Sequence, residues 1–298
     1  MSFITRQGRA LLLTAVLVVE SVCVSNGDNP ANLVGQWVSI KDGQNVELFK
    51  DGTGAVGDGN ITWKTEGKRF VLSSGNTSKI GDYNLSGYEF TRTFDDGEVV
   101  VWVRKDKVEE YKNKKKKEAE QRVEKMSTYF TDSRNGQKYR SVKIGGKTWM
   151  AQNLNYQTGN SWCYGGDNSN CEKYGRLYDW NTAKTACPTG WHLPSQKEWN
   201  DLVTASGGNA AGKALKSTYS WNNNGNGTDD YGFSALPGGI RFSTGSFGSF
   251  GYGGYWWTAT ENASSAYRWH MSYDGDDVYK YEYGGDKNDG YSVRCLQD

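Results

Sequence analysis

Few residues of this chain could carry out a reaction. The 298 residues include only two histidines, His192 and His270, and neither has a second metal ligand at a zinc-binding spacing. The sequence contains no Gly-x-Ser-x-Gly motif, so it does not indicate the turn that exposes a serine nucleophile. The sequence therefore predicts a protein that is not an enzyme and has no catalytic residue.

Aromatic side chains are better candidates, because they can bind a ligand without reacting. Tyr279, Tyr281 and Tyr283 alternate with a period of two and are expected on one face of a strand. Trp269 is expected to share a face of the preceding strand with its own period-two neighbours. Flat aromatic rings pack against the C–H surfaces of sugars, with polar groups at the rim. The alternative is that one of these faces belongs to the hydrophobic core.

The sequence Tyr255-Trp256-Trp257 adds a second aromatic group. Neighbours in an extended strand point to opposite faces, so at least one of these two tryptophans is expected near the surface. The full set of candidate ligand-binding residues is Tyr255, Trp256, Trp257, Trp269, Tyr279, Tyr281 and Tyr283.

Acidic residues gather in the turn expected between the two strands. Asp274, Asp276 and Asp277 offer carboxylate oxygens, which Ca²⁺ prefers, and Asp286 and Asn288 follow in the next loop. Calcium is therefore the one candidate cofactor. The alternative is that these are ordinary turn residues, since acidic side chains favour turns without any metal.

Residues 1–27 are typical of a signal peptide. Arg6 and Arg9 give a positive start, residues 10–19 are apolar, and small polar residues follow. The apolar run is shorter than the roughly 20 residues that a membrane-spanning helix needs. We therefore expect an exported protein, extracellular or on the outer cell surface. Cys23 is a candidate lipid anchor, which would be the only attachment to a membrane.

Four cysteines follow the expected signal peptide. An even number in an exported chain indicates two disulfides, and the residues alone leave three pairings open. The four are Cys163, Cys171, Cys187 and Cys295.

Residues 31–104 are expected to form a small antiparallel β-barrel or meander, because short apolar runs alternate with turn signals. The expected strands are 34–40, 46–49, 61–63, 69–72, 88–94 and 98–103. The opening Gly35-Gln-Trp37 resembles the start of a lipocalin-like barrel. The mouth of such a barrel can hold a ligand, although side chains fill most barrels of this size.

Residues 105–127 contain no Gly or Pro and many Lys and Glu, so we expect a charged helical linker. The alternative, that Lys114 to Lys117 bind an anionic polymer or a lipid headgroup, is less favoured because glutamates are interleaved. The net charge of +1 gives no reason to expect binding to nucleic acid.

Residues 128–298 combine strand and helix signals, so the fold class is α+β and β-rich. Residues 138–144 and 147–150 flank Gly145-Gly146, which predicts a hairpin with a primed turn. A short helix is expected at 180–185.

A second helix is expected at 196–204. Ser195 is a suitable N-cap, and Glu198 three residues later completes a capping box. Pro194 sets the start of the helix, because it cannot lie inside one.

Five motifs of this region, in order, resemble those of the Fibrobacter succinogenes major paralogous domain family. They are Lys147–Tyr156, Gly175–Trp180, Cys187–Trp199, Tyr255–Glu261 and Tyr291–Cys295. The resemblance runs from about residue 127 to the end of the chain. It implies a fold similar to C-type lectins and the formylglycine-generating enzyme, with no defined ligand.

The resemblance also bears on the cysteines. The long disulfide of C-type lectin-like folds implies that Cys187 pairs with Cys295, and we favour Cys163–Cys171 as the second bridge, which closes a small polar loop. The formylglycine-generating relatives use a cysteine pair near the C-terminus. Here Cys295 is the only cysteine in that region, so this activity is not expected.

These observations favour an exported, non-catalytic binding protein that adheres to a polysaccharide or to a surface or envelope protein through residues 128–298. The alternative is a structural component of an envelope or secreted assembly without a glycan ligand. An enzyme of the formylglycine-generating type is the least favoured hypothesis.

Overall fold

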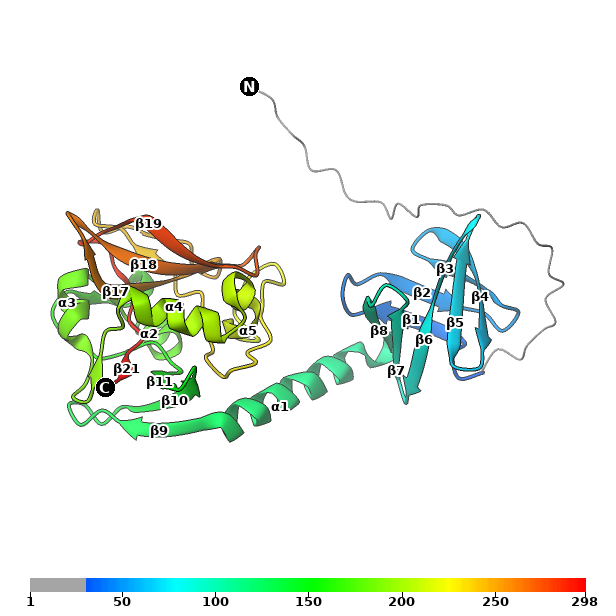
Figure 1. Cartoon of the computed structure of the whole chain (residues 1–298), viewed down its shortest axis with the longest axis horizontal. Helices are drawn as coiled ribbons and strands as arrows, with labels where there is room; N and C mark the ends of the chain where they lie inside the picture. The colour runs from blue at the N-terminus through cyan, green and yellow to red at the C-terminus, as the bar shows by residue number, and fades with distance from the viewer. Residues whose placement is uncertain (1–30) are drawn as a thin grey trace, which may run out of the picture. The chain divides into compact units, whose positions relative to one another are not determined.

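The computed structural model describes residues 31–298, so the expected signal peptide and Cys23 lie outside the described residues. The chain divides into two compact units after Lys114. Figure 1 shows a β-barrel in the first unit and an α+β arrangement in the second, which agrees with a β-rich fold class. None of the described helices is both long enough and apolar enough to cross a membrane.

The first unit is a closed barrel in which eight antiparallel strands pair in sequence order. β1 pairs with β8, with Val38 opposite Val103, so the sheet has no free edge. The strands are β1 (Gly35–Ser39), β2 (Asn45–Leu48), β3 (Thr53–Val56), β4 (Gly59–Glu66), β5 (Arg69–Ser74), β6 (Thr77–Ser86), β7 (Glu89–Phe94) and β8 (Val99–Arg104).

The sequence did not predict β3 and β6. Both contain glycine and polar residues, so their own preference for strand is low, and pairing with a strand on each side decides their structure. Gly81 in β6 shows how close this pairing is. A Cβ atom there would lie 2.3 Å from the carbonyl oxygen of Thr93 in β7, so only glycine fits.

The expected charged linker is the helix α1 (Val108–Met126), which follows the 3-10 turn η1 (Lys105–Lys107). The Lys112 ammonium lies 3.0 Å from the Glu109 carboxylate, one of several exposed ion pairs along the helix. Such exposed pairs contribute little to stability.

The second unit contains two main sheets. The five-stranded sheet has the order β14-β21-β11-β10-β9, and the six-stranded sheet has the order β12-β13-β20-β17-β18-β19. The strands are β9 (Ser127–Thr131), β10 (Lys138–Ile144), β11 (Lys147–Met150), β12 (Ser161–Trp162), β13 (Leu177–Tyr178), β14 (Trp191–His192), β15 (Ile240–Arg241), β16 (Phe247–Gly248), β17 (Gly253–Asn262), β18 (Ser265–Ser272), β19 (Val278–Asp286), β20 (Tyr291–Ser292) and β21 (Leu296–Gln297).

The helices of this unit are short. They are η2 (Tyr164–Gly166), α2 (Asn168–Tyr174), α3 (Trp180–Ala186), α4 (Gln196–Ala205), η3 (Gly208–Ala211) and α5 (Gly212–Leu215). The predicted hairpin is formed by β10 and β11. Gly145 and Gly146 at its turn both have positive φ, 58° and 81°, as a primed turn requires.

Helix α4 begins at Gln196, as predicted, and its capping box is complete. The Ser195 hydroxyl accepts a hydrogen bond from the Glu198 N–H, and the Glu198 carboxylate accepts one from the Ser195 N–H at 2.8 Å. Trp199 on the buried face lies 5.3 Å from Trp149 and 6.2 Å from Trp269, ring centre to ring centre. These indole contacts hold α4 against both sheets.

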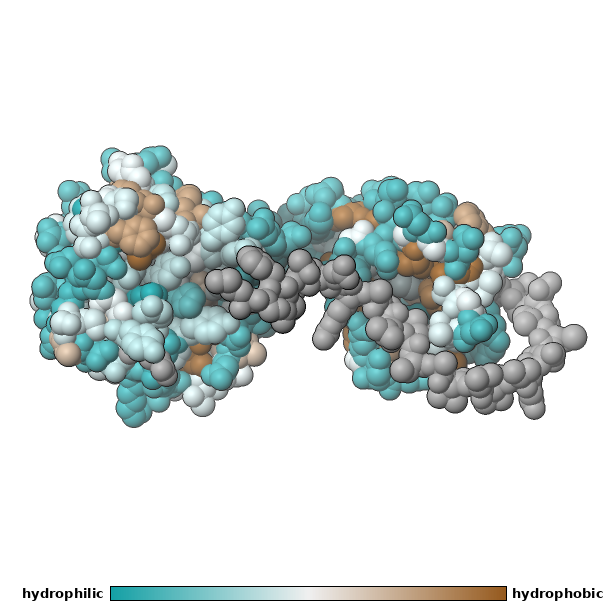
Figure 2. Space-filling model, turned by 90° about the horizontal axis from the view of Figure 1, so that it is seen from above, coloured by the Kyte–Doolittle hydropathy of each residue, from teal (hydrophilic) through white to brown (hydrophobic). Residues whose placement is uncertain are grey.

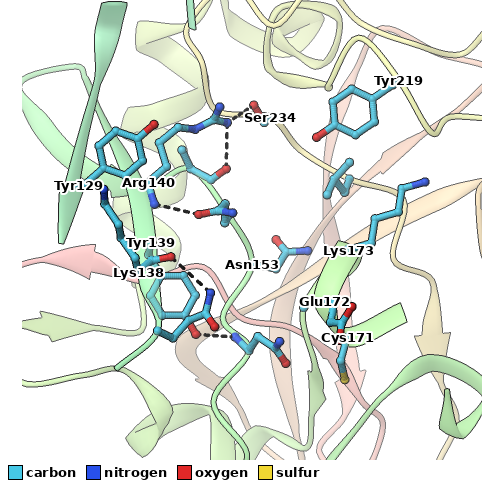
Figure 3. A pocket seen from close by; sticks show the side chains of 16 residues that line it. Tyr129, Lys138, Tyr139, Arg140, Asn153, Cys171, Glu172, Lys173, Tyr219 and Ser234 are labelled. Atoms are coloured by element: carbon cyan, nitrogen blue, oxygen red, sulfur yellow. Dashed lines mark hydrogen bonds between the residues drawn. The ribbon is translucent and has the colours of Figure 1, made fainter. Parts of the chain in front are cut away.

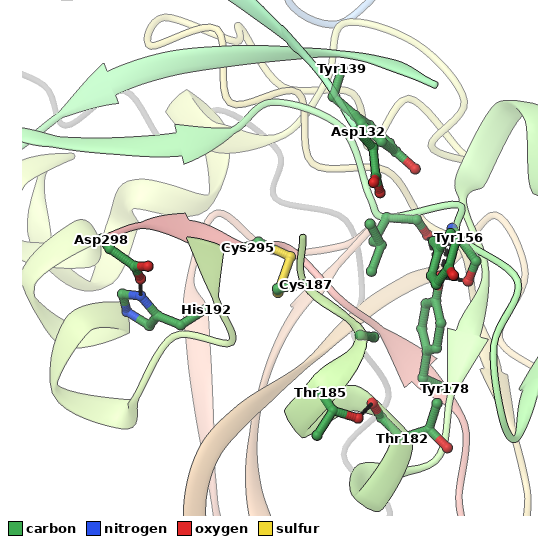
Figure 4. Close-up of a disulfide and its surroundings, with 12 residues drawn as sticks. Asp132, Tyr139, Tyr156, Tyr178, Thr182, Thr185, Cys187, His192, Cys295 and Asp298 are labelled. Atoms are coloured by element: carbon green, nitrogen blue, oxygen red, sulfur yellow. Dashed lines mark hydrogen bonds and ion pairs between the residues drawn. A yellow bond between two sulfur atoms is a disulfide. The ribbon is translucent and has the colours of Figure 1, made fainter. Parts of the chain in front are cut away.

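Both favoured disulfides are present. Cys187 at the end of α3 is joined to Cys295, immediately before β21, and Cys163 is joined to Cys171. Figure 4 shows the Cys187–Cys295 bridge. It links segments 108 residues apart, so it closes most of the second unit into one loop.

Removing this bridge should destabilise the second unit strongly. Loop entropy predicts a loss of about 5 kcal/mol for Cys187→Ser with Cys295→Ser, and about 2.5 kcal/mol for Cys163→Ser with Cys171→Ser, because the second loop is much shorter. Urea denaturation of the two double variants measures the difference. Equal losses would contradict the account.

Acid should weaken the capping box. Burial of Glu198 opposes its ionisation, but hydrogen bonds from Ser195, Lys147 and His192 outweigh burial and lower its pKa from 4.5 to about 2. The stabilisation by its carboxylate is therefore complete above pH 4.5 and is lost as the pH falls toward 2. We expect Glu198→Gln to be less stable than wild type at pH 7, with a smaller gap at pH 3, measured by urea denaturation. A gap that is the same at both pH values would refute this.

Candidate functional site

The three tryptophans among the predicted binding residues are buried. Trp256 and Trp257 are both 0% exposed and Trp269 is 4% exposed. Trp256 packs near α4, whereas Trp257 faces a second core and donates its indole N–H to the carbonyl oxygen of Tyr178 at 2.7 Å. The expectation that one of the pair lies near the surface is wrong, because this sheet is covered on both faces.

The predicted tyrosines lie differently. Tyr279 and Tyr281 are 43% and 42% exposed, Tyr283 is 82% exposed, and all three lie on β19 at the edge of the six-stranded sheet. We call these three residues the tyrosine row. Figure 2 views the molecule from above Figure 1 and shows a second unit with a largely hydrophilic surface and small apolar areas.

Cationic and aromatic side chains support the tyrosine row. The His270 ring stacks between Tyr255 and Tyr279, with ring centres 5.5 and 4.9 Å apart. The Arg268 guanidinium lies 4.1 Å from the centre of the Tyr281 ring. Burial, and then the charge of Arg268, lowers the pKa of His270 to about 4, so this imidazole is neutral at pH 7. The face can offer aromatic contact and one cation.

The calcium prediction is not supported. Among the side chains that the structure describes, no three of His, Cys, Asp or Glu are grouped closely enough to hold a metal ion. Asp277 accepts the Tyr279 hydroxyl at 2.9 Å. The Lys216 ammonium donates to the carbonyl oxygens of Ser272 and Gly275, so the turn already has its own cation. Burial lowers the pKa of Lys216, and the charges of Asp276 and Asp274 offset part of that lowering.

In the next loop, the acidic side chain is also engaged by a neighbouring residue. Asp286 accepts hydrogen bonds from the backbone and side-chain amides of Asn288, at 2.9 and 3.1 Å. Both residues therefore stabilise their own loop, as acidic and amide side chains in turns commonly do.

A buried arginine organises the interior beside the six-stranded sheet. Arg294 is 0% exposed, and its guanidinium donates to the Asn153 side-chain oxygen at 2.8 Å and to the carbonyl oxygens of Phe233 and Ser234. Burial lowers its pKa to about 9, so it stays cationic at neutral pH. Carbonyl and amide oxygens therefore solvate this charge in place of water.

Asn153 extends these contacts. Its side-chain oxygen also accepts the Trp256 indole N–H at 2.9 Å, and its amide donates to the Tyr174 carbonyl and to the Ser292 hydroxyl. We call Arg294 with Asn153 the arginine hub. It joins β17, β20 and α2 to the segment after β11.

A pocket of about 300 Å³ borders the arginine hub through Asn153. Asn153 and Ser234 contribute to its lining, and Arg140 of β10 donates to the Ser234 hydroxyl and to the Ala151 carbonyl. Ser234 has a left-handed φ of 53° and is held there because Asp229 accepts both its N–H and its hydroxyl. The floor is thus polar and fixed.

The walls of this pocket carry exposed aromatic and charged side chains. Tyr129 and Tyr219 are 45% and 46% exposed. Figure 3 shows Tyr129 and Arg140 on one side, Tyr219 and Lys173 on the other, and Asn153 between them. We call this pocket the polar groove.

The charge of the polar groove is unbalanced. Its lining includes the cations Lys138, Arg140 and Lys173 but only one carboxylate, Glu172. The side-chain amides of Gln152 and of other lining residues add hydrogen-bond donors and acceptors. A groove with aromatic walls and a polar, cationic lining suits a sugar chain that carries hydroxyl and carboxylate groups.

Sequence reasoning missed the polar groove. Tyr129, Arg140, Asn153 and Tyr219 come from four separate segments, and none has a periodicity that marks it as a ligand contact. Only Asn153 lies in one of the motifs singled out above. The position of Asn153 in that motif was the one available signal, and it did not predict which residues would lie beside Asn153.

A comparison with protein families shows to which family the second unit is related. The model of the Fibrobacter succinogenes major domain matches residues 142–297, more than half of the chain. The chain belongs to the Fibrobacter succinogenes major domain family. No curated protein and no solved structure matches it. Within this Fibrobacter succinogenes major domain lie Asn153, Trp256 and Arg294, whereas Tyr129 and Arg140 precede the matched range.

The contacts of the arginine hub predict that two substitutions destabilise the domain to different degrees. Asn153→Ala leaves a buried guanidinium and a buried indole N–H without their acceptor, so we expect a loss of about 3 kcal/mol or more. Arg294→Met removes the charge together with its need for acceptors and should cost less. Thermal or urea unfolding of both variants gives the comparison. A smaller loss for Asn153→Ala would show that the hub does not organise this core.

Proposed function

We propose that this protein is an exported, non-catalytic protein that binds a polysaccharide in the polar groove of its Fibrobacter succinogenes major domain. The observation that carries the proposal is the pair of exposed tyrosines, Tyr129 and Tyr219, that line opposite sides of a pocket with a polar floor (Figure 3). Sugars are bound by aromatic stacking combined with hydrogen bonds from fixed polar groups, and the groove offers both.

The lining of the groove favours an acidic polysaccharide. Three cations against one carboxylate leave a surplus of positive charge, which suits uronic acid residues.

Export is supported by the signal-like residues 1–27 and by the two disulfides, which persist in oxidising compartments. A C-type lectin-like fold for residues 128–298 is part of the same proposal, and the long Cys187–Cys295 bridge supports it. A lipid anchor at Cys23 remains a prediction.

A partner protein is the second candidate ligand. The tyrosine row favours it, because β19 is an edge strand with three exposed aromatic side chains. Exposed tyrosines are common in protein interfaces. In this case the protein would be a component of an envelope or secreted assembly.

Binding to polysaccharides that are immobilised on beads tests the proposal. We expect the mature chain to be retained on polygalacturonate and glucuronoxylan more than on cellulose, and salt to weaken the retention. Tyr219→Ala and Tyr129→Ala should each raise the Kd about threefold to tenfold, because each removes one stacking contact. Depletion isotherms measure these values.

Tyr283→Ala is the matched control, since it removes a more exposed tyrosine outside the groove. If only Tyr283→Ala lost polysaccharide binding, the binding site would be the tyrosine row and not the polar groove. No retention on any polysaccharide would reject the proposal and favour the assembly component.

A further inference from the structure

The β-barrel of the first unit holds a cavity of about 480 Å³, larger than the polar groove. It opens where the turns β1–β2, β3–β4, β5–β6 and β7–β8 gather. Figure 2 shows apolar side chains at the centre of the barrel unit, surrounded by hydrophilic ones. The apolar lining consists of Val56, Ile61, Leu72, Phe94, Val100 and Trp102.

Polar and charged side chains also line the cavity, and one of the charged ones, Arg92, is buried. Arg92 on β7 lines the cavity and is 1% exposed. Its guanidinium lies 3.8 Å from the centre of the Phe94 ring and donates to the Lys79 carbonyl. Its Nε has no hydrogen-bond partner among the described residues. A buried guanidinium with a spare donor is costly unless something accepts from it.

The neighbouring carboxylates are already engaged. Asp95 lies on the exposed β7–β8 turn and accepts both its bonds from Arg69, at 2.6 and 2.8 Å. Glu98 at the mouth accepts from Lys41 at 2.6 Å and from Lys79 at 3.4 Å. Burial lowers the pKa of Arg92 to about 10, so the guanidinium is still charged at neutral pH. Asp42 also lines the cavity and accepts the Gln44 N–H at 3.1 Å. Among the described residues, no carboxylate therefore forms an ion pair with Arg92.

We infer that the barrel binds a small amphiphile with one carboxylate and an apolar body. The carboxylate accepts hydrogen bonds from Arg92, and the apolar body lies against Ile61, Leu72 and Trp102. The volume lies within the range of small-molecule sites in proteins. A charge-assisted pair between guanidinium and carboxylate is among the stronger hydrogen-bonded contacts, and the apolar walls exclude the water that would weaken it.

A comparison of octanoate with octan-1-ol tests this directly, because the two differ only in the head group. Isothermal titration calorimetry of the full chain should give an affinity for octanoate at least tenfold higher than for the alcohol. Arg92→Met keeps the volume and removes the charge, so the preference for octanoate should disappear while octan-1-ol binds as well or better. Arg92→Lys should retain part of the preference.

Arg69→Met is the control, because Arg69 is an exposed cation paired with Asp82 and Asp95. It should leave the preference unchanged. Equal binding of the two probes by wild type, no binding of either, or a preference that survives in Arg92→Met would each overturn the inference. If Arg92→Met does not fold, the wild-type comparison and Arg92→Lys still decide the outcome.

Discussion

The interior of the family domain depends on how one buried cation is solvated. Arg294 is fully buried, and no salt bridge to a carboxylate satisfies it in the described structure; the Asn153 side chain and two backbone carbonyls do so instead. Such an arrangement works only when every acceptor is held in place, since an uncompensated buried charge is strongly destabilising. The acceptors come from segments far apart in the sequence, so the charge fixes how these segments lie together.

This constraint gives a physical reason for several family motifs. Asn153 belongs to the motif at Lys147–Tyr156, Trp256 to Tyr255–Glu261, and Arg294 to Tyr291–Cys295, and the three meet at one side-chain oxygen. The disulfide from Cys295 to Cys187 fixes the residue next to Arg294. Two of these acceptor residues, Asn153 and Ser234, also line the polar groove, so the contacts that solvate Arg294 also hold part of the groove in place.

The sequence predicted features that depend on neighbours along the chain. The capping box of Ser195 and Glu198 and the Gly145-Gly146 hairpin were confirmed, because each is decided within a few residues. Burial depends on what covers a strand, which period-two alternation does not reveal. Trp256 and Trp257 point to opposite faces as expected, yet both faces are covered. The polar groove and the cavity around Arg92 arise from side chains that tertiary packing brings together. No spacing in the sequence therefore predicted them.

We propose that the arginine hub supports a groove that holds a sugar chain between Tyr129 and Tyr219. The most direct test is a crystal structure of the protein with a trigalacturonate soaked into the crystals. We expect density for a sugar ring between Tyr129 and Tyr219, with its carboxylate near Arg140 or Lys173. Density for the oligosaccharide against the tyrosine row, or an empty groove at saturating ligand, would contradict it.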